Sequence, residues 1–421
     1  MSDEQVYTIK RDGRKVLFDR CRISDAILRA SKDVQELDAS IAYELTDEIC
    51  TRLFHKGHRE FAVEEIQDEV VEVLTLRYPK IATAYAIYRQ KRTDARELKS
   101  VENQVISDIV MQDAAENDSK RENANIDGNS VMGAMLKIGG TAAKEFNLRN
   151  LIKPKHAKMH RDGLLHLHDL DFMALTVNCM QIPLGKLLRN GFNTGHGSLR
   201  PPATIGSAAT LMCIIIQSCQ NDFYGGQAIP TVDYDLAPYV AKSYVRNLAE
   251  YLEVKYELDH KKLKEQFVSI LDDYIYVHGH VINDQGYAKI TEVLDAVIGS
   301  TINYHQTESE MFDYTFKKTD RDTFQAMEAT VHNLCTLQSR CGAQPPFSSL
   351  NFGTDTSEEG RIVTKNLLLA TEKGLGAGET AIFPISIFKM KKGINDKGSK
   401  NYDLFKLACR VSALRLFPKQ N

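Results

Sequence analysis

Hydrophobic and polar residues follow one another over the first part of the chain in a pattern that predicts two short strands and then helices. Residues 6–18 contain two apolar runs around an Asp-Gly dipeptide, which tolerates positive φ angles, so they are predicted to form a β-hairpin. Three stretches between residues 23 and 74 then repeat apolar side chains at helical spacing, and residues 81–92 form a fourth. Residues 1–95 are therefore predicted to be a small α+β domain, a hairpin capped by a helix bundle.

The pattern changes near residue 100. Residues 96–124 are polar and rich in Asp, Glu, Asn and Lys, which is typical of a linker or a connecting helix. From residue 125 to residue 421, helical stretches alternate with apolar strands that Gly and Pro separate, an α/β pattern. Within this part, residues 380–390 predict a buried strand that follows a helix at residues 364–373. Residues 247–325 are more charged and predict a helical excursion from the α/β pattern.

Composition and charge exclude several classes of protein. The 421 residues, of which 43% are hydrophobic and 26% charged, suffice for two or three domains with a buried core. The formal net charge is -3, so no overall basic field favours nucleic acid. The first residues lack the basic and then apolar run of a secretory signal, and the longest apolar run, residues 208–217, is too short to cross a bilayer. We therefore expect a cytoplasmic protein with no nucleic-acid or membrane partner.

The eight cysteines are scattered along the chain, and no two of them form a Cys-x-x-Cys pair. Reduced thiols are the expectation for a long chain without the cysteine density of a disulfide scaffold. A structural zinc site needs closely spaced pairs of ligands, so no metal site is predicted. The cysteines are Cys21, Cys50, Cys179, Cys213, Cys219, Cys335, Cys341 and Cys409.

A group of basic residues lies in and directly after the predicted hairpin: Lys10, Arg11, Arg14, Lys15, Arg20 and Arg22. The group is either an ordinary solvated surface or a cradle for a polyphosphate. The string KRDGRKVLFDRCRISDAI, with the later EEIQDEVVEVL and AYAIYRQKR, resembles the ATP-cone domain, which binds ATP or dATP as allosteric effectors and switches ribonucleotide reductases on or off. By this resemblance the nucleotide-contacting residues are Lys10, Arg11, Arg22, Gln67 and Arg89, with Gln67 standing where some members carry His.

Further segments follow in one order: ENANIDGNS (122–130), GLLHLHDLDF (163–172), TVNCMQIPLGKLL (176–188), PPATIGSAAT (201–210), YGGQAIPTVDYDLAPYV (224–240), SRCGAQPPFSSLNFGTD (339–355) and NYDLFKLACRVSALRLFP (401–418). They resemble the anaerobic, class III ribonucleotide reductases along essentially the whole chain. The resemblance implies an incomplete version of that family's ten-stranded α/β barrel, a homodimer, and reduction of ribonucleoside triphosphates to deoxyribonucleoside triphosphates with formate as reductant. It also implies a zinc site and a glycyl radical, which a separate iron–sulfur activase installs with S-adenosylmethionine.

Cys179 stands in the sequence Val-Asn-Cys-Met. Taken alone, such a cysteine is more often buried and inert. Radical removal of a ribose 2′-hydroxyl requires a hydrogen-abstracting thiyl on one face of the sugar and a reductant on the other, and sulfur supports one-electron chemistry. By resemblance, Cys179 is the family's second active-site cysteine, which works with formate.

His166 and His168 are two residues apart, so on a strand both would point to one face, with Asp169 at the end. On spacing alone, the two histidines could be a pair of metal ligands or, more commonly, core histidines that hydrogen-bond to the backbone. By resemblance, this segment lies in the active-site region near Cys179 and helps to bind formate. We expect a polar, proton-handling role for the two histidines and no metal.

Cys409 lies on an amphipathic run that extends from Leu404 to Leu414, and it is predicted to be a structural cysteine of a helix. The family's thiyl cysteine belongs to a Met-Gly-Cys-Arg segment. That segment, the zinc-binding Cys-x-x-Cys pairs and the glycyl-radical segment do not occur in the 421 residues. Two hypotheses follow: a partly represented reductase that is inactive by itself, or a non-catalytic ATP- or dATP-binding regulatory protein that associates with an intact reductase.

Overall fold

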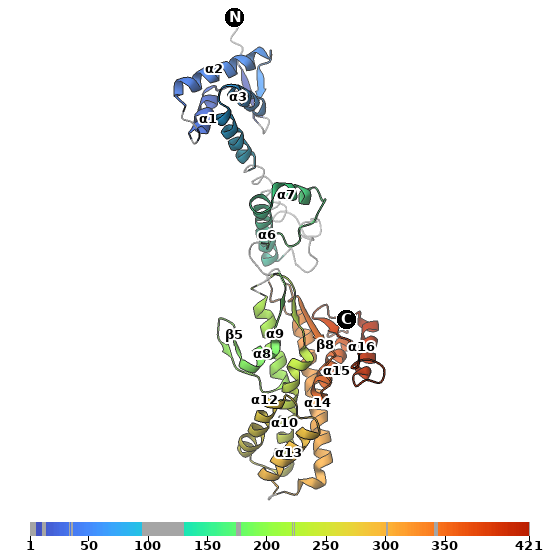
Figure 1. Ribbon diagram of the computed structural model, residues 1–421. Coiled ribbons are helices and arrows are strands. Elements are labelled where there is room, and N and C mark those ends of the chain that lie inside the picture. Colours follow the sequence, from blue (N-terminus) through green and yellow to red (C-terminus); the bar gives the residue numbers. More distant parts are fainter. Residues whose placement is uncertain are drawn as a thin grey trace. The chain divides into compact units, whose positions relative to one another are not determined.

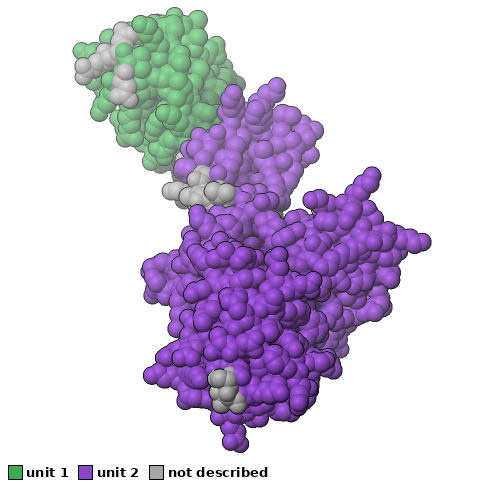
Figure 2. Space-filling view, turned by 60° about the horizontal axis from the view of Figure 1, so that its bottom comes forward, with its two compact units in different colours: residues 1–107 green, residues 108–421 purple. Residues whose placement is uncertain are grey.

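The chain packs as two units, residues 1–107 and residues 108–421 (Figure 2). The computed structural model describes residues 6–10, 14–32, 34, 37–94, 130–173, 178–220, 222, 224–299, 302–340 and 344–420. The predicted linker, residues 96–124, lies outside these ranges.

The sheet of the first unit has three strands in the order β2-β1-β3. Strands β1 (Tyr7–Ile9) and β2 (Lys15–Leu17) are antiparallel, with Tyr7 opposite Leu17, so the predicted hairpin is confirmed. Strand β3 (Glu60–Ala62) joins β1 in parallel and was not predicted. Its three residues are too short to give a periodic pattern, and its central residue, Phe61, is fully buried.

Helices cover this small sheet, as the apolar spacing predicts. They are α1 (Cys21–Ser31), α2 (Ala39–His55), α3 (Val63–Arg77) and the helical residues 79–94. The repeating apolar positions form one core, which includes the fully buried Ile27, Ile49 and Val73. Asp38 caps α2, because its carboxylate accepts a hydrogen bond from the Ser40 amide.

The second unit begins with a helical pair and a turn-rich segment. Helix α6 (Val131–Asn150) is followed by α7 (Pro154–Arg161), and residues 162–173 form turns and bends. A small core of Leu148, Ala157 and Leu170 joins the three pieces. The buried Asn147 amide also donates to the Leu170 carbonyl at 2.7 Å, so the turn segment is fixed to α6.

Five parallel strands form the main sheet, in the order β10-β9-β8-β7-β4. Spatial order follows sequence order, with helices between successive strands, so the predicted α/β class is confirmed. Strand β9 is shorter than the predicted strand at residues 380–390. The strands are β4 (Met180–Gln181), β7 (Gln227–Ile229), β8 (Ser348–Phe352), β9 (Ile385–Phe388) and β10 (Lys419–Gln420).

The two faces of this sheet differ in burial. On β8, Leu350 and Phe352 are fully buried in the core, whereas Ser349 and Asn351, which point to the other face, are half-buried. The described helices therefore cover one face. Helices α9 (Ile205–Cys219), α10 (Val232–Tyr256), α14 (Glu308–Thr336) and α15 (Glu358–Lys373) pack together beside the strands (Figure 1).

The remaining elements complete the connections. The predicted helical excursion is confirmed, because helices follow one another from α10 to α14. The elements are α8 (Leu184–Asn190), the hairpin of β5 (Phe192–Asn193) and β6 (Ser198–Leu199), α11 (His260–Leu263), the π-helix Lys264–Val268, α12 (Ser269–His278), α13 (Asp284–Val297), the 3-10 helix Tyr304–Thr307 and α16 (Tyr402–Arg415). Within the described ranges, no helix combines the length and the apolar character needed to cross a membrane.

Candidate active site and nucleotide site

Cys179 lies at the amino edge of the main sheet, directly before β4, and its side chain is exposed. Three backbone hydrogen bonds fix the strand entries to one another. The Met180 amide donates to the Gly226 carbonyl at 3.1 Å, the Gly225 amide donates to Asn178 at 2.5 Å, and the Gln227 amide donates to Phe347 at 2.8 Å. The position of Cys179 is thus set by the entries of β7 and β8, which lie far from it in the sequence.

Two buried polar side chains lie at the same edge. Gln227 and Ser348 are register partners at the starts of β7 and β8, and both are almost fully buried. Among the described residues, the Gln227 Oε1 and Ser348 Oγ atoms have no hydrogen-bond partner. A buried polar atom without a partner costs about 1–3 kcal/mol. Both side chains lie on the helix-covered face of the sheet with Leu350, so they are not open to a molecule at the half-buried face. Both residues belong to segments that carry the family resemblance, but their pairing depends on contacts between distant parts of the chain, which the sequence does not predict.

His166 and His168 are exposed and lie in the turn segment, so they do not stand on a strand. The alternating pattern of this segment has no partner strand, and the backbone turns at Asp169, where φ is 48°. The two imidazole rings still lie close together, with centroids 5.7 Å apart. His168 Nε2 is 3.4 Å from the Asp169 carboxylate.

A third histidine, His160 of α7, adjoins this pair, with its ring centroid 5.8 Å from that of His166. Its Nδ1 atom accepts a hydrogen bond from the Leu167 amide. Burial, with the charges of Lys144 and His166, lowers the pKa of His160. The three rings therefore lie in one group. The described part of the chain contains no cluster of three or more His, Cys, Asp or Glu side chains arranged to hold a metal ion.

The histidine segment and the sheet edge meet through two aromatic rings. Phe172 stacks on Tyr224, with centroids 3.8 Å apart and an angle of 13° between the rings. Tyr224 directly precedes the glycine that donates to Asn178. No hydrogen bond or ion pair among the described residues joins Cys179 to either histidine.

The nucleotide contacts predicted in the first unit lie on separate elements. Lys10 directly follows β1. The exposed Arg22 lies in the first turn of α1 and pairs with Asp19, and Gln67 lies on α3. Arg89, from the helical residues 79–94, forms an ion pair with Asp68, the neighbour of Gln67, so these two elements are brought together. Arg11 lies outside the described residues.

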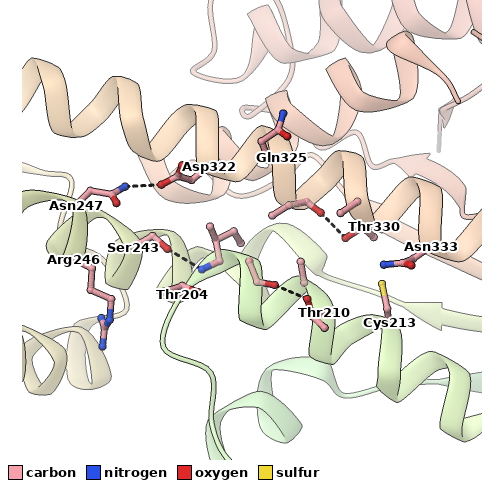
Figure 3. A pocket seen from close by; sticks show the side chains of 15 residues that line it. Thr204, Thr210, Cys213, Ser243, Arg246, Asn247, Asp322, Gln325, Thr330 and Asn333 are labelled. Atoms are coloured by element: carbon pink, nitrogen blue, oxygen red, sulfur yellow. Dashed lines mark hydrogen bonds between the residues drawn. The ribbon is translucent and has the colours of Figure 1, made fainter. Parts of the chain in front are cut away.

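A cavity of about 500 Å³ lies between α9, α10 and α14 (Figure 3). Small side chains such as Gly206, Ala209 and Ala326 line its walls. At one end, the Asn247 amide donates to Thr319 and to Asp322, both at 3.0 Å. At the other end, burial raises the pKa of Cys213 to about 11, which keeps this thiol protonated and unreactive at neutral pH.

These features define a class of protein: a parallel α/β domain with a thiol at the amino edge of its sheet, preceded by a separate α+β unit. The family model for anaerobic ribonucleoside-triphosphate reductase matches residues 122–420, and the model for the ATP cone domain matches residues 6–94. The chain therefore belongs to the anaerobic ribonucleoside-triphosphate reductase family and carries an ATP-cone domain. Members of this family are oxidoreductases.

Individual relatives agree with this assignment. The anaerobic ribonucleoside-triphosphate reductases of Haemophilus influenzae and Escherichia coli are each 30% identical to this chain, over 97% and 98% of its length. The chain spans about half the length of these curated relatives, 51% in each case. A solved structure of the anaerobic ribonucleotide reductase from Thermotoga maritima aligns with 77% of this chain and 48% of that protein, at 12% identity and a TM-score of 0.44.

Proposed function

We propose that this chain provides the nucleotide-regulated part and the reducing-side thiol of an enzyme that converts ribonucleoside triphosphates to deoxyribonucleoside triphosphates. The observation that carries the proposal is the exposed Cys179 at the amino edge of the parallel sheet, in a chain whose family is that of such reductases. An inert structural cysteine would be expected in the core, as Cys213 is.

In this function Cys179 is the thiol that faces the ribose opposite the thiyl group, and formate is the terminal reductant. His166 and His168 bind formate and handle its proton. Their exposure and the proximity of the two rings support this role, since a small anion has access to both.

The half-buried face of the sheet supports the expectation of a ten-stranded barrel. Ser349 and Asn351 of β8, Ala228 of β7, and Ile385 and Ile387 of β9 lie on this face. In a closed barrel, further strands would cover such residues. The five described strands would then be half of the barrel.

The ATP-cone domain binds ATP or dATP in this proposal, through Lys10, Arg11, Arg22, Gln67 and Arg89. The ion pair between Arg89 and Asp68 supports a shared site for Arg89 and Gln67, because it holds the two elements together. The predicted boundaries, with a domain at residues 1–95, a linker at 96–124 and the catalytic part at 125–421, belong to the same proposal.

The homodimer, the activase and the glycyl radical are proposed for the whole enzyme. The family's zinc does not fit these residues, since the chain has no Cys-x-x-Cys pair and its described part gathers no metal-ligating cluster. The alternative function is a non-catalytic regulatory protein that binds ATP or dATP and associates with an intact reductase.

An anaerobic assay separates the two functions. The 421-residue polypeptide is incubated with activase, S-adenosylmethionine, formate, ATP and CTP, beside a hybrid that joins it to the C-terminal portion of a relative. The proposal predicts no dCTP from the 421 residues alone and formate-dependent dCTP from the hybrid. An inactive hybrid that folds, binds ATP and forms the glycyl radical favours the regulatory alternative.

A further inference from the structure

Five side chains form a continuous cluster of ring contacts, which we call the aromatic cluster: Phe172, Tyr224, Arg340, Phe347 and Phe383. The Arg340 guanidinium lies 4.6 Å from the Tyr224 ring centroid and 4.3 Å from that of Phe347. Phe347 in turn lies 5.4 Å from Phe383. The cluster therefore links distant segments of the chain, from Phe172 to Phe383, around one cation.

The cluster lies along the amino edge of the main sheet. Tyr224, Phe347 and Phe383 come shortly before β7, β8 and β9, respectively. The residue after Tyr224 is Gly225, whose amide fixes Asn178 beside Cys179. The aromatic cluster and the proposed reducing thiol thus share the same strand entries.

Arg340 is held in place by more than the two rings. Its guanidinium donates a short hydrogen bond to the Tyr224 carbonyl. Its backbone also forms an antiparallel bridge with the fully buried Gln344, through amide-to-carbonyl bonds of 3.2 and 3.4 Å. A planar guanidinium stacks on rings while it donates in its own plane, which an ammonium group does not do.

The turn segment, residues 162–173, is attached at several points. Near its middle, the Leu167 amide donates to His160 Nδ1. Towards its C-terminal end, Leu170 packs on α6 and α7 and accepts the Asn147 hydrogen bond, and Phe172 stacks on Tyr224 of the aromatic cluster. His166 and His168 are exposed, so neither is held by burial of its own side chain.

We propose that Arg340 is a positioning residue that holds the histidine-bearing turn segment at the amino edge of the sheet, through Tyr224 and Phe172. Arg340 fixes the Tyr224 backbone and ring, and the Tyr224 ring fixes Phe172. The consequence for formate binding rests on the proposed function of Cys179 and the two histidines. The placement of the turn segment by Arg340 does not depend on that function.

Amide hydrogen exchange of residues 164–173, measured in the 421-residue protein, tests whether Arg340 holds the turn segment in place. We expect Arg340→Lys, which keeps the charge and loses the stacking plane, to speed exchange of this segment at least tenfold. Phe172→Leu should do the same, and Phe172→Tyr, which keeps the ring, should leave exchange within twofold of the unsubstituted protein. The amides of α6 serve as the control, since they should not change in any variant.

Unchanged exchange in both Arg340→Lys and Phe172→Leu, with α6 protection intact, would overturn the proposal. In the active hybrid, Arg340→Lys should raise the KM for formate at least fivefold, while ATP binding by the first unit stays constant. A hybrid without any reductase activity refutes the proposed function, whereas the exchange data still decide the role of Arg340.

Discussion

Gly225 lies so close to Asn178 that no side chain fits between them. A Cβ atom on residue 225 would come 2.0 Å from the Asn178 carbonyl oxygen, far inside van der Waals contact. This approach brings the entry of β4, and with it Cys179, against the entry of β7. The glycine is required by the close approach of two backbones.

We predict that Gly225→Ala destabilises the second unit by about 1–3 kcal/mol, because either β4 or β7 must move to relieve the overlap. The midpoint of urea unfolding, followed by a signal of the second unit, measures the effect. Gly206→Ala on α9 is the matched control, since a Cβ there meets nothing within 4 Å and alanine favours a helix. Equal midpoints for the two variants would show that the strand entries separate without cost.

Asp233 is predicted to be a strong stabilising residue. It is almost fully buried in the first turn of α10, and one carboxylate oxygen accepts hydrogen bonds from the amides of Gly353, Thr354 and Asp355 at 2.8–3.1 Å. Asp233→Ala leaves three amides without this acceptor and should lower the free energy of unfolding by about 3 kcal/mol or more. Asp313→Ala, which removes an exposed pair with Lys317, should cost less than about 1 kcal/mol. Comparable losses in both variants would contradict the assignment.

The pair of His280 and Glu359 is predicted to make stability depend on pH. Glu359 is fully buried and accepts hydrogen bonds from the amides of Val281 and Ile282, both at 2.7 Å. Its other oxygen lies 3.6 Å from His280 Nδ1. Glu359 raises the pKa of His280 against the opposite effect of burial, and the nearby Asp355 adds to the increase. Burial alone would raise the pKa of Glu359, but His280 and the two amides outweigh it and lower that pKa.

Because its pKa is raised in the folded state, His280 adds to the free energy of unfolding. This stabilisation is complete below the unfolded-state pKa of about 6.5 and is lost as pH rises through the folded-state pKa. Because its pKa is lowered in the folded state, Glu359 also adds to the free energy of unfolding. This stabilisation is present above the unfolded-state pKa of about 4.3 and is lost as pH falls through the folded-state pKa. Thermal unfolding of the unsubstituted protein and His280→Gln should therefore differ most near pH 5.5–6. The difference should shrink as pH rises through the raised folded-state pKa of His280, and also in acid. A difference that grows with pH would contradict this linkage.

The cone is predicted to bind ATP or dATP through cations on separate elements. A charge-assisted contact with phosphate is worth about 1.5–3 kcal/mol, so Lys10→Ala and Arg22→Ala should each weaken binding about tenfold or more. Isothermal calorimetry measures the affinity directly. Lys80→Ala, an exposed cation at the start of the helical residues 79–94, is the control and should bind as the unsubstituted protein does. Unchanged affinity in both site variants would refute the assignment.

The sequence predicts those parts of the fold that have a local signal. Ile27, Ile49 and Val73 belong to amphipathic repeats, and such repeats identify a helix without any partner. Strand β4 has two residues, and its existence depends on the distant Gly226 and Ala228 carbonyls. No local pattern predicts such a strand.

The candidate site is harder to predict from the sequence, because it too depends on contacts between distant segments. Cys179, His166 and His168 were selected by resemblance. The two histidines lie in turns and not on a strand, because alternation without a pairing partner does not fix an extended backbone. Arg340 carried no individual signal, since its role depends on rings from Tyr224 and Phe347. The composition and periodicity of a chain do not predict contacts between distant segments.

Substitution of Cys179 in the active hybrid tests the central claim most directly. In an anaerobic assay with activase, S-adenosylmethionine, formate, ATP and CTP, we predict that Cys179→Ala keeps the glycyl electron-spin signal and forms no dCTP. Cys21→Ala, which removes another exposed thiol from the first unit, should retain formate-dependent dCTP formation. Formation of dCTP by the Cys179→Ala hybrid at the rate of the unsubstituted hybrid would contradict the account.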